Sequence, residues 1–253
     1  MTEAVIQYKP LGLFPLRWKR YIPQKWEQLT PRQMHAVAKV IYGRLTDASL
    51  VKELLNIPMF VARKLPPFYV FSLVEHLDFL YEYKARNSFA IDKIGDGVCP
   101  EPRLEGMSFA QFIFVDSYFS ELTETNNVQT LNKFIAALYI PQGQPFSEKT
   151  IKKRAGAMAR ENYYRKQAIV LNYRLVREWL HDSYPLVFQK ITDDKENKPE
   201  RKKTNTKKHS WVRVFEAIVG DDIANEEKYA EKPVHRILRF MQNKIKENAR
   251  RKF

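Results

Sequence analysis

The chain has 253 residues, and 44% of them are hydrophobic, which is enough to bury a core and excludes wholesale disorder. Its uninterrupted apolar runs are far shorter than the roughly 20 residues that a bilayer span needs, and its first ten residues do not have the pattern of a signal peptide. A single cysteine, Cys99, excludes an intramolecular disulfide and a multi-cysteine zinc site. We therefore expect a soluble protein of the cytoplasm that does not interact with membranes.

The charge is distributed very unevenly along the chain. The chain contains 43 Lys and Arg residues and 29 Asp and Glu residues, which gives a formal net charge of +14. Residues 1–148 hold 16 basic and 15 acidic residues (net +1), which leaves 27 and 14 (net +13) for residues 149–253. The basic surplus concentrates in residues 149–177, 195–208 and 232–252. This asymmetry indicates an acidic partner such as nucleic acid, an anionic surface or an acidic protein; the alternative is that these basic faces are simply solvated.

The first third of the chain predicts a small β-ribbon followed by helices. Two extended segments, 5–8 and 16–22, flank a Pro-Gly turn at residues 9–12, which favours a two-stranded ribbon. Thr30-Pro31-Arg32-Gln33 is a capping box with proline at the first helical position, followed by apolar residues at helical spacing. Ser49 can cap a short helix that stops before Pro58, and Pro66-Pro67 opens a helix whose apolar stripe starts at Phe68 and Phe71 and continues to Tyr81.

The middle of the chain predicts a loop and then three helices. Residues 85–107 lack helical periodicity and are interpreted as a loop with a short extended piece at 89–94. Ser108 and Gln111 form a second capping box, and Asn127 can cap the next helix, which stops at Pro141. The longest helix is expected from about Glu161 to His181.

The C-terminal part predicts a linker and a pair of helices. Residues 192–208 contain no hydrophobic residue and are predicted to be a flexible basic linker. Ser210 can cap a helix that Gly220 closes, and a last helix starts at about Pro233. The predicted fold is mainly α: a multi-helix bundle with a small N-terminal β-ribbon (residues 1–191), the linker, and a C-terminal helical pair (residues 209–253).

None of the local motifs of catalysis or cofactor binding is present. There is no P-loop, dinucleotide-binding glycine pattern or nucleophile elbow, and the five histidines are scattered without metal-ligand spacing. Cys99 precedes Pro100 in the expected loop and has no neighbouring histidine to activate it. We therefore predict a protein that is not an enzyme and uses no cofactor or metal, although an enzyme built from dispersed residues stays as a third hypothesis.

Several segments resemble proteins that are encoded by tailed bacteriophages and prophages. They are residues 21–33 (YIPQKWEQLTPRQ), residues 107–112 (MSFAQF) with Asp116, and residues 131–141 (LNKFIAALYIP). The resemblance implies a small, helical, non-catalytic protein from the tail-gene region, acting as an assembly chaperone or accessory factor in the host cytoplasm, with association with the virion left open. Its partner would be a phage structural protein such as a tape-measure-like chain, or a second copy of itself.

Two sets of residues are candidates for these interactions. An assembly chaperone would need exposed apolar side chains that hold partner helices. The alternative is that the helices after the linker dock on the main body. The candidate partner-binding residues are Trp179, Trp211, Phe215, Ile237, Leu238 and Met241. The alternative function, nucleic-acid binding by the basic C-terminal part, would use Lys202, Lys203, Lys207, Lys208, Arg236 and Arg239.

Overall fold

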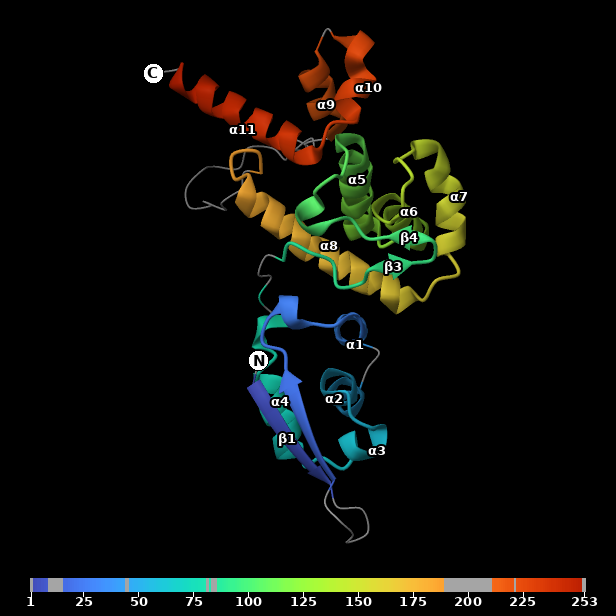
Figure 1. Cartoon of the computed structure of the whole chain (residues 1–253), viewed down its shortest axis with the longest axis vertical. Coiled ribbons are helices and arrows are strands. Elements are labelled where there is room, and N and C mark those ends of the chain that lie inside the picture. Colours follow the sequence, from blue (N-terminus) through green and yellow to red (C-terminus); the bar gives the residue numbers. More distant parts are fainter. Residues whose placement is uncertain are drawn as a thin grey trace, which may run out of the picture. The chain divides into compact units, whose positions relative to one another are not determined.

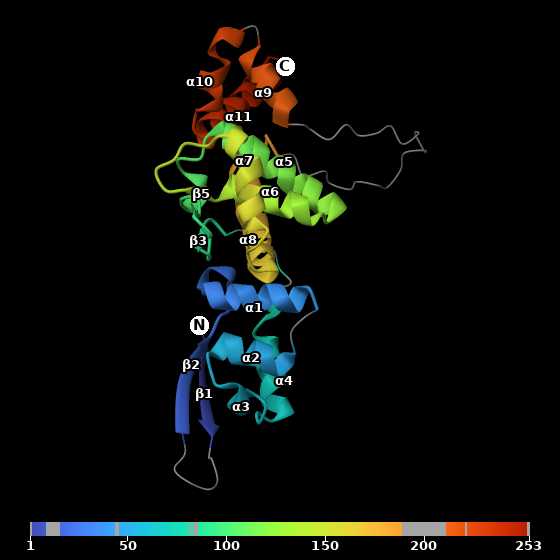
Figure 2. The ribbon, with the colours of Figure 1, turned by 90° about the vertical axis from the view of Figure 1, so that its right-hand side faces the viewer.

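A computed structural model describes residues 2–8, 16–43, 46–80, 82, 86–188, 211–220 and 222–251 (Figures 1 and 2). The fold is mainly helical, with a small N-terminal antiparallel sheet and C-terminal helices, as predicted. The chain divides into two compact units: Met1–Ile94 with Glu161–Trp179 (unit 1), and Gly95–Arg160 with Leu180–Phe253 (unit 2). The predicted linker at 192–208 lies outside the described residues, so the proposed boundaries at 191 and 209 stay predictions.

Unit 1 begins with the predicted β-ribbon. Strands β1 (Thr2–Tyr8) and β2 (Leu16–Ile22) pair antiparallel, with Ile6 opposite Trp18. A 3₁₀ turn (Trp26–Gln28) follows. The remaining elements of unit 1 are α1 (Pro31–Ile41), α2 (Asp47–Leu55), α3 (Met59–Ala62), α4 (Pro67–Glu75), a 3₁₀ turn (Asp78–Leu80), β3 (Lys93–Ile94) and the first part of α8 (Tyr163–Ser183).

Local capping explains where the first helices start and end. The capping box of α1 is confirmed, because the Thr30 side chain accepts from the backbone N–H of Gln33 while the Gln33 side chain accepts from the Thr30 N–H. The predicted cap of α2 was one turn late: Thr46, not Ser49, caps this helix, and Ser49 lies in its first turn. The helix stops before Pro58, as predicted, at Asn56, which adopts the left-handed conformation.

Polar side chains organise the irregular segment 86–91 in unit 1. The Asn172 side chain of α8 donates to the Ser88 carbonyl (2.9 Å) and accepts from the Ala90 N–H (2.7 Å). The buried Arg86 donates to the carbonyls of Trp26 (2.5 Å) and Ser88 (2.8 Å). Because these buried backbone groups are satisfied by side chains, the segment can lie inside the unit without forming regular structure. The predicted extended piece at 89–94 is therefore a strand only at Lys93–Ile94.

Unit 2 is built around two consecutive helices, α5 (Phe109–Thr125) and α6 (Val128–Leu138), which are connected by a turn at Asn126 and Asn127. Asn127 caps α6 as predicted. The other elements are β4 (Gly97–Val98), a 3₁₀ turn (Pro102–Leu104), β5 (Ile140–Pro141), α7 (Glu148–Met158), the end of α8, α9 (Trp211–Val219), a 3₁₀ turn (Ile223–Asn225), α10 (Glu226–Ala230) and α11 (Val234–Arg250).

Helix α7 was not predicted, because its sequence has too few apolar residues to show a helical period. Of its eleven residues, only Ile151 and Met158 are buried, two turns apart on one face. The remaining residues are charged or small, and the helix packs on α6. A helix that is so polar carries little periodic signal, and its order comes from tertiary packing.

The C-terminal end of α6 is closed by side chains from other helices. The Gln111 amide of α5 donates to the carbonyls of Ala137 (2.9 Å) and Leu138 (3.3 Å). The Arg154 guanidinium of α7 donates to the carbonyls of Ala136 (2.6 Å) and Tyr139. The last carbonyls of a helix have no partner within it, so these donors replace a glycine cap. The second predicted capping box is therefore only half formed: Ser108 accepts from the Gln111 N–H, but the Gln111 side chain reaches α6 instead.

Candidate functional site

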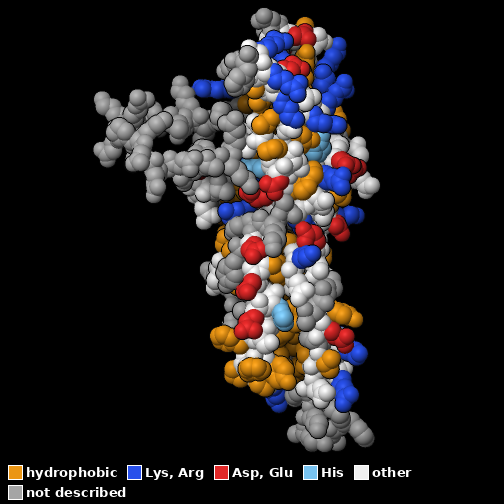
Figure 3. Space-filling model, turned by 90° about the vertical axis from the view of Figure 1, so that its left-hand side faces the viewer, with side chains coloured by type: hydrophobic (Ala, Val, Ile, Leu, Met, Phe, Trp, Pro, Cys, Tyr) orange, Lys and Arg blue, Asp and Glu red, His pale blue; other side chains and the backbone are white. Residues whose placement is uncertain are grey.

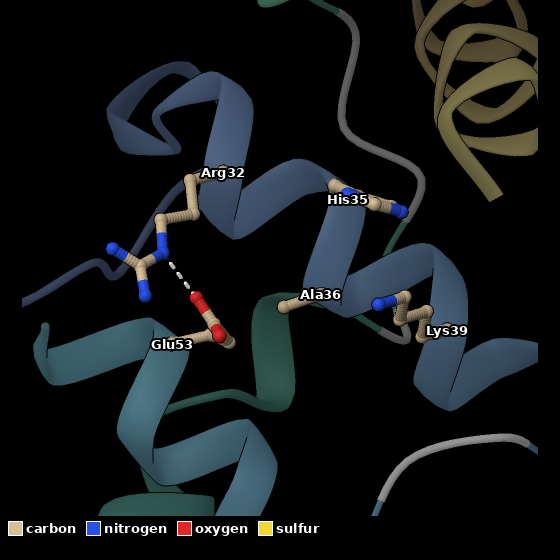
Figure 4. A pocket seen from close by; sticks show the side chains of 5 residues that line it. All are labelled: Arg32, His35, Ala36, Lys39 and Glu53. Atoms are coloured by element: carbon tan, nitrogen blue, oxygen red, sulfur yellow. Dashed lines mark hydrogen bonds and ion pairs between the residues drawn. The ribbon is translucent and has the colours of Figure 1, made fainter. Parts of the chain in front are cut away.

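A small polar hollow lies between α1 and α2 in unit 1 (Figure 4). It has a volume of about 190 Å³ and is lined by Arg32, His35, Ala36, Lys39 and Glu53. Arg32, His35 and Lys39 follow one another at helical spacing on α1, and Arg32 points toward Glu53 of α2, with which it forms an ion pair (Figure 4). Lys52 adds a second ion pair to Glu53, at 3.1 Å.

The ionisable groups of this hollow stabilise one another's ordinary charge states. The hydrogen bond from Arg32 holds the pKa of the Glu53 carboxyl below its usual range, and the same contact raises the pKa of Arg32. Burial, followed by the positive charge of Lys39, lowers the pKa of His35. The His35 Nε2 atom is buried with no hydrogen-bond partner among the described residues, which also disfavours protonation. The cluster thus joins α1 to α2, and none of its members is arranged as a nucleophile beside a base.

The described residues contain no group of three or more His, Cys, Asp or Glu side chains that could hold a metal ion. Among the helices of the same ranges, none is long and apolar enough to cross a membrane. Cys99 is half-buried.

The most distinctive surface of unit 1 is an exposed group of aromatic side chains on α3 and α4. Phe68 and Phe71 are 78% and 75% exposed, and Tyr69 and Phe60 are 56% and 54% exposed. The rings of Phe68 and Tyr69 meet edge to face, with their centroids 6.3 Å apart. We call these four residues the aromatic face, and Figure 3 shows hydrophobic side chains gathered over this part of the surface.

The aromatic face corrects the prediction for this helix. Phe68 and Phe71 were expected in the apolar stripe of a helix that reaches Tyr81, but α4 ends at Glu75 and both rings face solvent. A signal was present in the sequence, because the PFYVF segment is apolar on every side of a helix. A helix at the edge of a small unit can bury only one of its faces, so some of these rings had to remain exposed.

The candidate partner-binding residues of the C-terminal part pack inside unit 2 instead of forming an exposed apolar surface. Trp211 and Phe215 of α9 contact Phe109 with ring centroids 6.1 Å away in each case, and Trp211 also contacts Phe112 at 5.0 Å. Ile237 and Leu238 of α11 are buried. Met241 of α11 is half-buried. Trp179, the remaining candidate, lies on α8 at the end of unit 1 and is also half-buried.

Backbone hydrogen bonds add to this attachment of the C-terminal helices. The Phe109 N–H donates to the Lys232 carbonyl (2.8 Å), and the Val234 N–H donates to the Met107 carbonyl (2.9 Å). These two bonds surround an antiparallel bridge between Ser108 and Pro233. In the structure, the C-terminal helices that were predicted to follow a linker therefore pack on α5, which corresponds to the docking on the main body that the sequence left open.

Of the candidate nucleic-acid-binding residues, Arg236 and Arg239 lie on α11 and are exposed. Lys202, Lys203, Lys207 and Lys208 lie outside the described residues. The structure thus places two of the six candidates, and both are on the same helix.

Comparison of the chain with protein-family models, curated proteins and solved structures finds no match.

Proposed function

We propose that the chain is a non-catalytic protein-binding factor that holds a partner through the aromatic face on α3 and α4. The observation that carries the proposal is the exposure of Phe68 and Phe71, each three-quarters or more accessible. Burying a large apolar side chain stabilises a protein or a complex by about 1.5–3 kcal/mol, and a ring that stays in water does not contribute this free energy. Contiguous exposed apolar residues of this kind mark interaction surfaces in soluble proteins.

The composition of the aromatic face suits a protein partner. Aromatic side chains are enriched at the centres of protein interfaces, where a few of them supply most of the binding energy. Phe68 and Phe71 are three residues apart on α4, so their rings project from neighbouring positions on the helix surface. Arg63 and Lys64 lie between α3 and α4 and are exposed, which places positive charge beside the rings. A helical partner segment with an apolar stripe and flanking acidic residues would fit this surface.

The resemblance to proteins of tailed bacteriophages suggests tail assembly as the process in which the protein acts. We place the partner among the tail structural proteins, with a tape-measure-like chain as the first candidate, so the protein would assist tail assembly as a chaperone or accessory factor. A long helical chain of that kind exposes apolar stripes until it assembles, and a chaperone that covers them would prevent aggregation.

Co-expression with the tape-measure product of the same gene cluster tests this proposal. We expect a stable complex with the unchanged chain and at least about tenfold weaker binding for the double variant Phe68→Ser, Phe71→Ser, since aromatic hot spots contribute about 2 kcal/mol or more each. The matched control is Tyr21→Ser, Phe240→Ser, which removes two exposed aromatic rings elsewhere and should leave binding unchanged.

Three results would contradict the proposal: no complex with any tail structural protein, a complex that the Phe68→Ser, Phe71→Ser variant retains at full affinity, or equal losses in the control. Sedimentation of the chain alone separates a second copy from a phage partner. If the unchanged chain forms dimers that the double variant loses, the aromatic face is a self-association surface and the tail-protein partner is wrong.

A further inference from the structure

The last helix carries a straight row of basic side chains on the face opposite its buried residues. Arg236, Arg239, Lys246 and Arg250 are all exposed. At 100° per residue, these four positions of α11 fall within an arc of about 80°, and they extend over about 21 Å of helix length. We call these four residues the basic stripe.

The opposite face of α11 anchors the helix in unit 2. Three residues of this face, Val234, Ile237 and Leu238, are buried. The Tyr184 hydroxyl also forms a 2.8 Å hydrogen bond with Nδ1 of His235. The start of α11, which carries Arg236 and Arg239, is therefore anchored. The C-terminal half of the helix, which carries Lys246 and Arg250, extends beyond α5, α9 and α10 (Figure 1). Figure 3 shows Lys and Arg side chains gathered over the C-terminal helices.

Charge on α11 is almost entirely of one sign. Its single acidic residue, Glu247, lies at the edge of the stripe, and Asn243 lies within it. Such a row of like charges disfavours folding by self-repulsion and is not needed to cover the buried face. Only Arg250 lies in the last turn of the helix, where the helix dipole favours a positive charge.

From this arrangement we propose that the basic stripe of α11 binds the phosphate backbone of a nucleic-acid duplex. An α-helix fits the major groove of B-form DNA, and a row of cations along it can contact phosphates, which recur on each strand about every 3.4 Å of the duplex axis. A membrane surface is a poorer fit, because Val234, Ile237 and Leu238 are buried in the protein and Phe240 is the one large hydrophobic side chain that is exposed among the described residues of α11. An acidic protein is also a poorer fit, because protein interfaces need an apolar centre that the stripe lacks.

The test is the salt dependence of binding between the full-length protein and a fluorescent 20-base-pair DNA duplex of mixed sequence. Four phosphate contacts give a log–log slope of about −3.6, so the stripe alone should weaken binding about 150-fold between 50 and 200 mM salt. In the variant Arg236→Gln, Arg239→Gln, Lys246→Gln, Arg250→Gln, we expect the magnitude of the slope to fall by about 3.6. The two half-variants, Arg236→Gln with Arg239→Gln and Lys246→Gln with Arg250→Gln, should each remove about half of that.

A matched control removes four positive charges from exposed positions of the same unit. Lys149, Lys152, Lys153 and Arg160 are exposed in and just after α7, so their replacement by Gln changes the net charge equally and should preserve the slope. Circular dichroism checks that the helices of each variant are retained; if the fourfold variant unfolds, the two half-variants decide.

Several outcomes would overturn the inference. They are no binding to the duplex at 50 mM salt, an unchanged slope in the stripe variants, or an equal fall in the control. Tighter binding to single-stranded DNA of the same length would overturn the choice of a duplex. Equal affinity for polyglutamate or for phosphatidylserine vesicles would overturn the choice of nucleic acid. The aromatic face is intact in all of these variants, so the result is independent of the proposed protein-binding function.

Discussion

The indole Nε1 of Trp211 donates a 2.7 Å hydrogen bond to the Oδ2 atom of Asp116. Asp116 lies in the middle of α5 and is only 2% exposed, whereas Trp211 is the first residue of α9. The hydrogen bond thus connects the start of α9 to α5, the central helix of unit 2. Because the acceptor is a buried carboxyl group, this contact should be one of the stronger attachments of the C-terminal helices.

We expect Trp211→Phe to destabilise the protein by about 1.5–3 kcal/mol, since the ring packing is largely kept while a hydrogen bond to a buried carboxylate is lost. Urea unfolding measures the change. Asp116→Leu, which removes the acceptor, serves as the partner variant, and combining the two should give less than the sum of the single effects. Additive effects would show that the two side chains are not energetically coupled.

The end of α6 depends on Arg154. We expect Arg154→Met, which keeps the aliphatic stem, to destabilise unit 2 by about 1–3 kcal/mol, because the carbonyls of Ala136 and Tyr139 lose their donor. Thermal or urea unfolding tests this, with the neighbouring exposed residue as the control: Lys153→Met should change stability by less than about 0.5 kcal/mol. Equal effects at both positions would refute the capping role of Arg154.

Two glycines of unit 2 should respond to alanine in opposite directions. A Cβ at Gly97 of β4 would lie 2.6 Å from the Tyr139 carbonyl oxygen and 2.8 Å from the Tyr139 Cβ, whereas a Cβ at Gly156 of α7 would meet nothing within 4 Å. We expect Gly97→Ala to destabilise by roughly 1–3 kcal/mol and Gly156→Ala to stabilise by about 0.5–1 kcal/mol. Differential scanning calorimetry of the two variants decides, and a harmless Gly97→Ala would mean that β4 and β5 do not approach so closely.

The polar hollow predicts a dependence of stability on pH. In the unfolded chain His35 takes up a proton near pH 6.5, but the folded protein lowers its pKa. At a pH between the lowered pKa of the folded state and about 6.5, the unfolded state binds more protons than the folded state. The free energy of unfolding should therefore fall as the pH drops below about 6.5. His35→Gln should remove this dependence. Lys39→Gln should reduce it only partly, because burial, not the lysine charge, is the largest cause.

Glu53 predicts a second, separate window at lower pH. Its pKa lies below 4.5 in the folded state because of the hydrogen bond from Arg32, so the stabilisation is present above 4.5 and is lost as the pH falls through the lowered value. Glu53→Gln should therefore flatten the acid limb of a stability–pH curve measured by urea unfolding. An unchanged acid limb would mean that the Arg32–Glu53 pair contributes nothing in solution.

Local sequence signals were sufficient to predict the helix ends and turns whose backbone hydrogen bonds are made by neighbouring residues. The capping box of Thr30 and Gln33, the cap at Asn127, the stop at Gly220 and the two extended segments around the Pro-Gly turn could be interpreted correctly. A cap or a turn is satisfied by residues within a few positions. The mainly helical fold and the N-terminal ribbon follow from such signals. The start of α2 was misplaced because Thr46 and Ser49 are both good caps within one turn of each other.

Only the tertiary structure decided which apolar and polar side chains remain at the surface. Phe68 lies in a more apolar segment than Ile237, yet Phe68 faces solvent and Ile237 is buried, because burial depends on which helix packs opposite the side chain. The C-terminal end of α6 likewise uses donors from Gln111 and Arg154, which are 27 and 18 residues away from the carbonyls of Leu138 and Ala136. Such contacts form between segments distant in sequence, and no local pattern of residues encodes their partners.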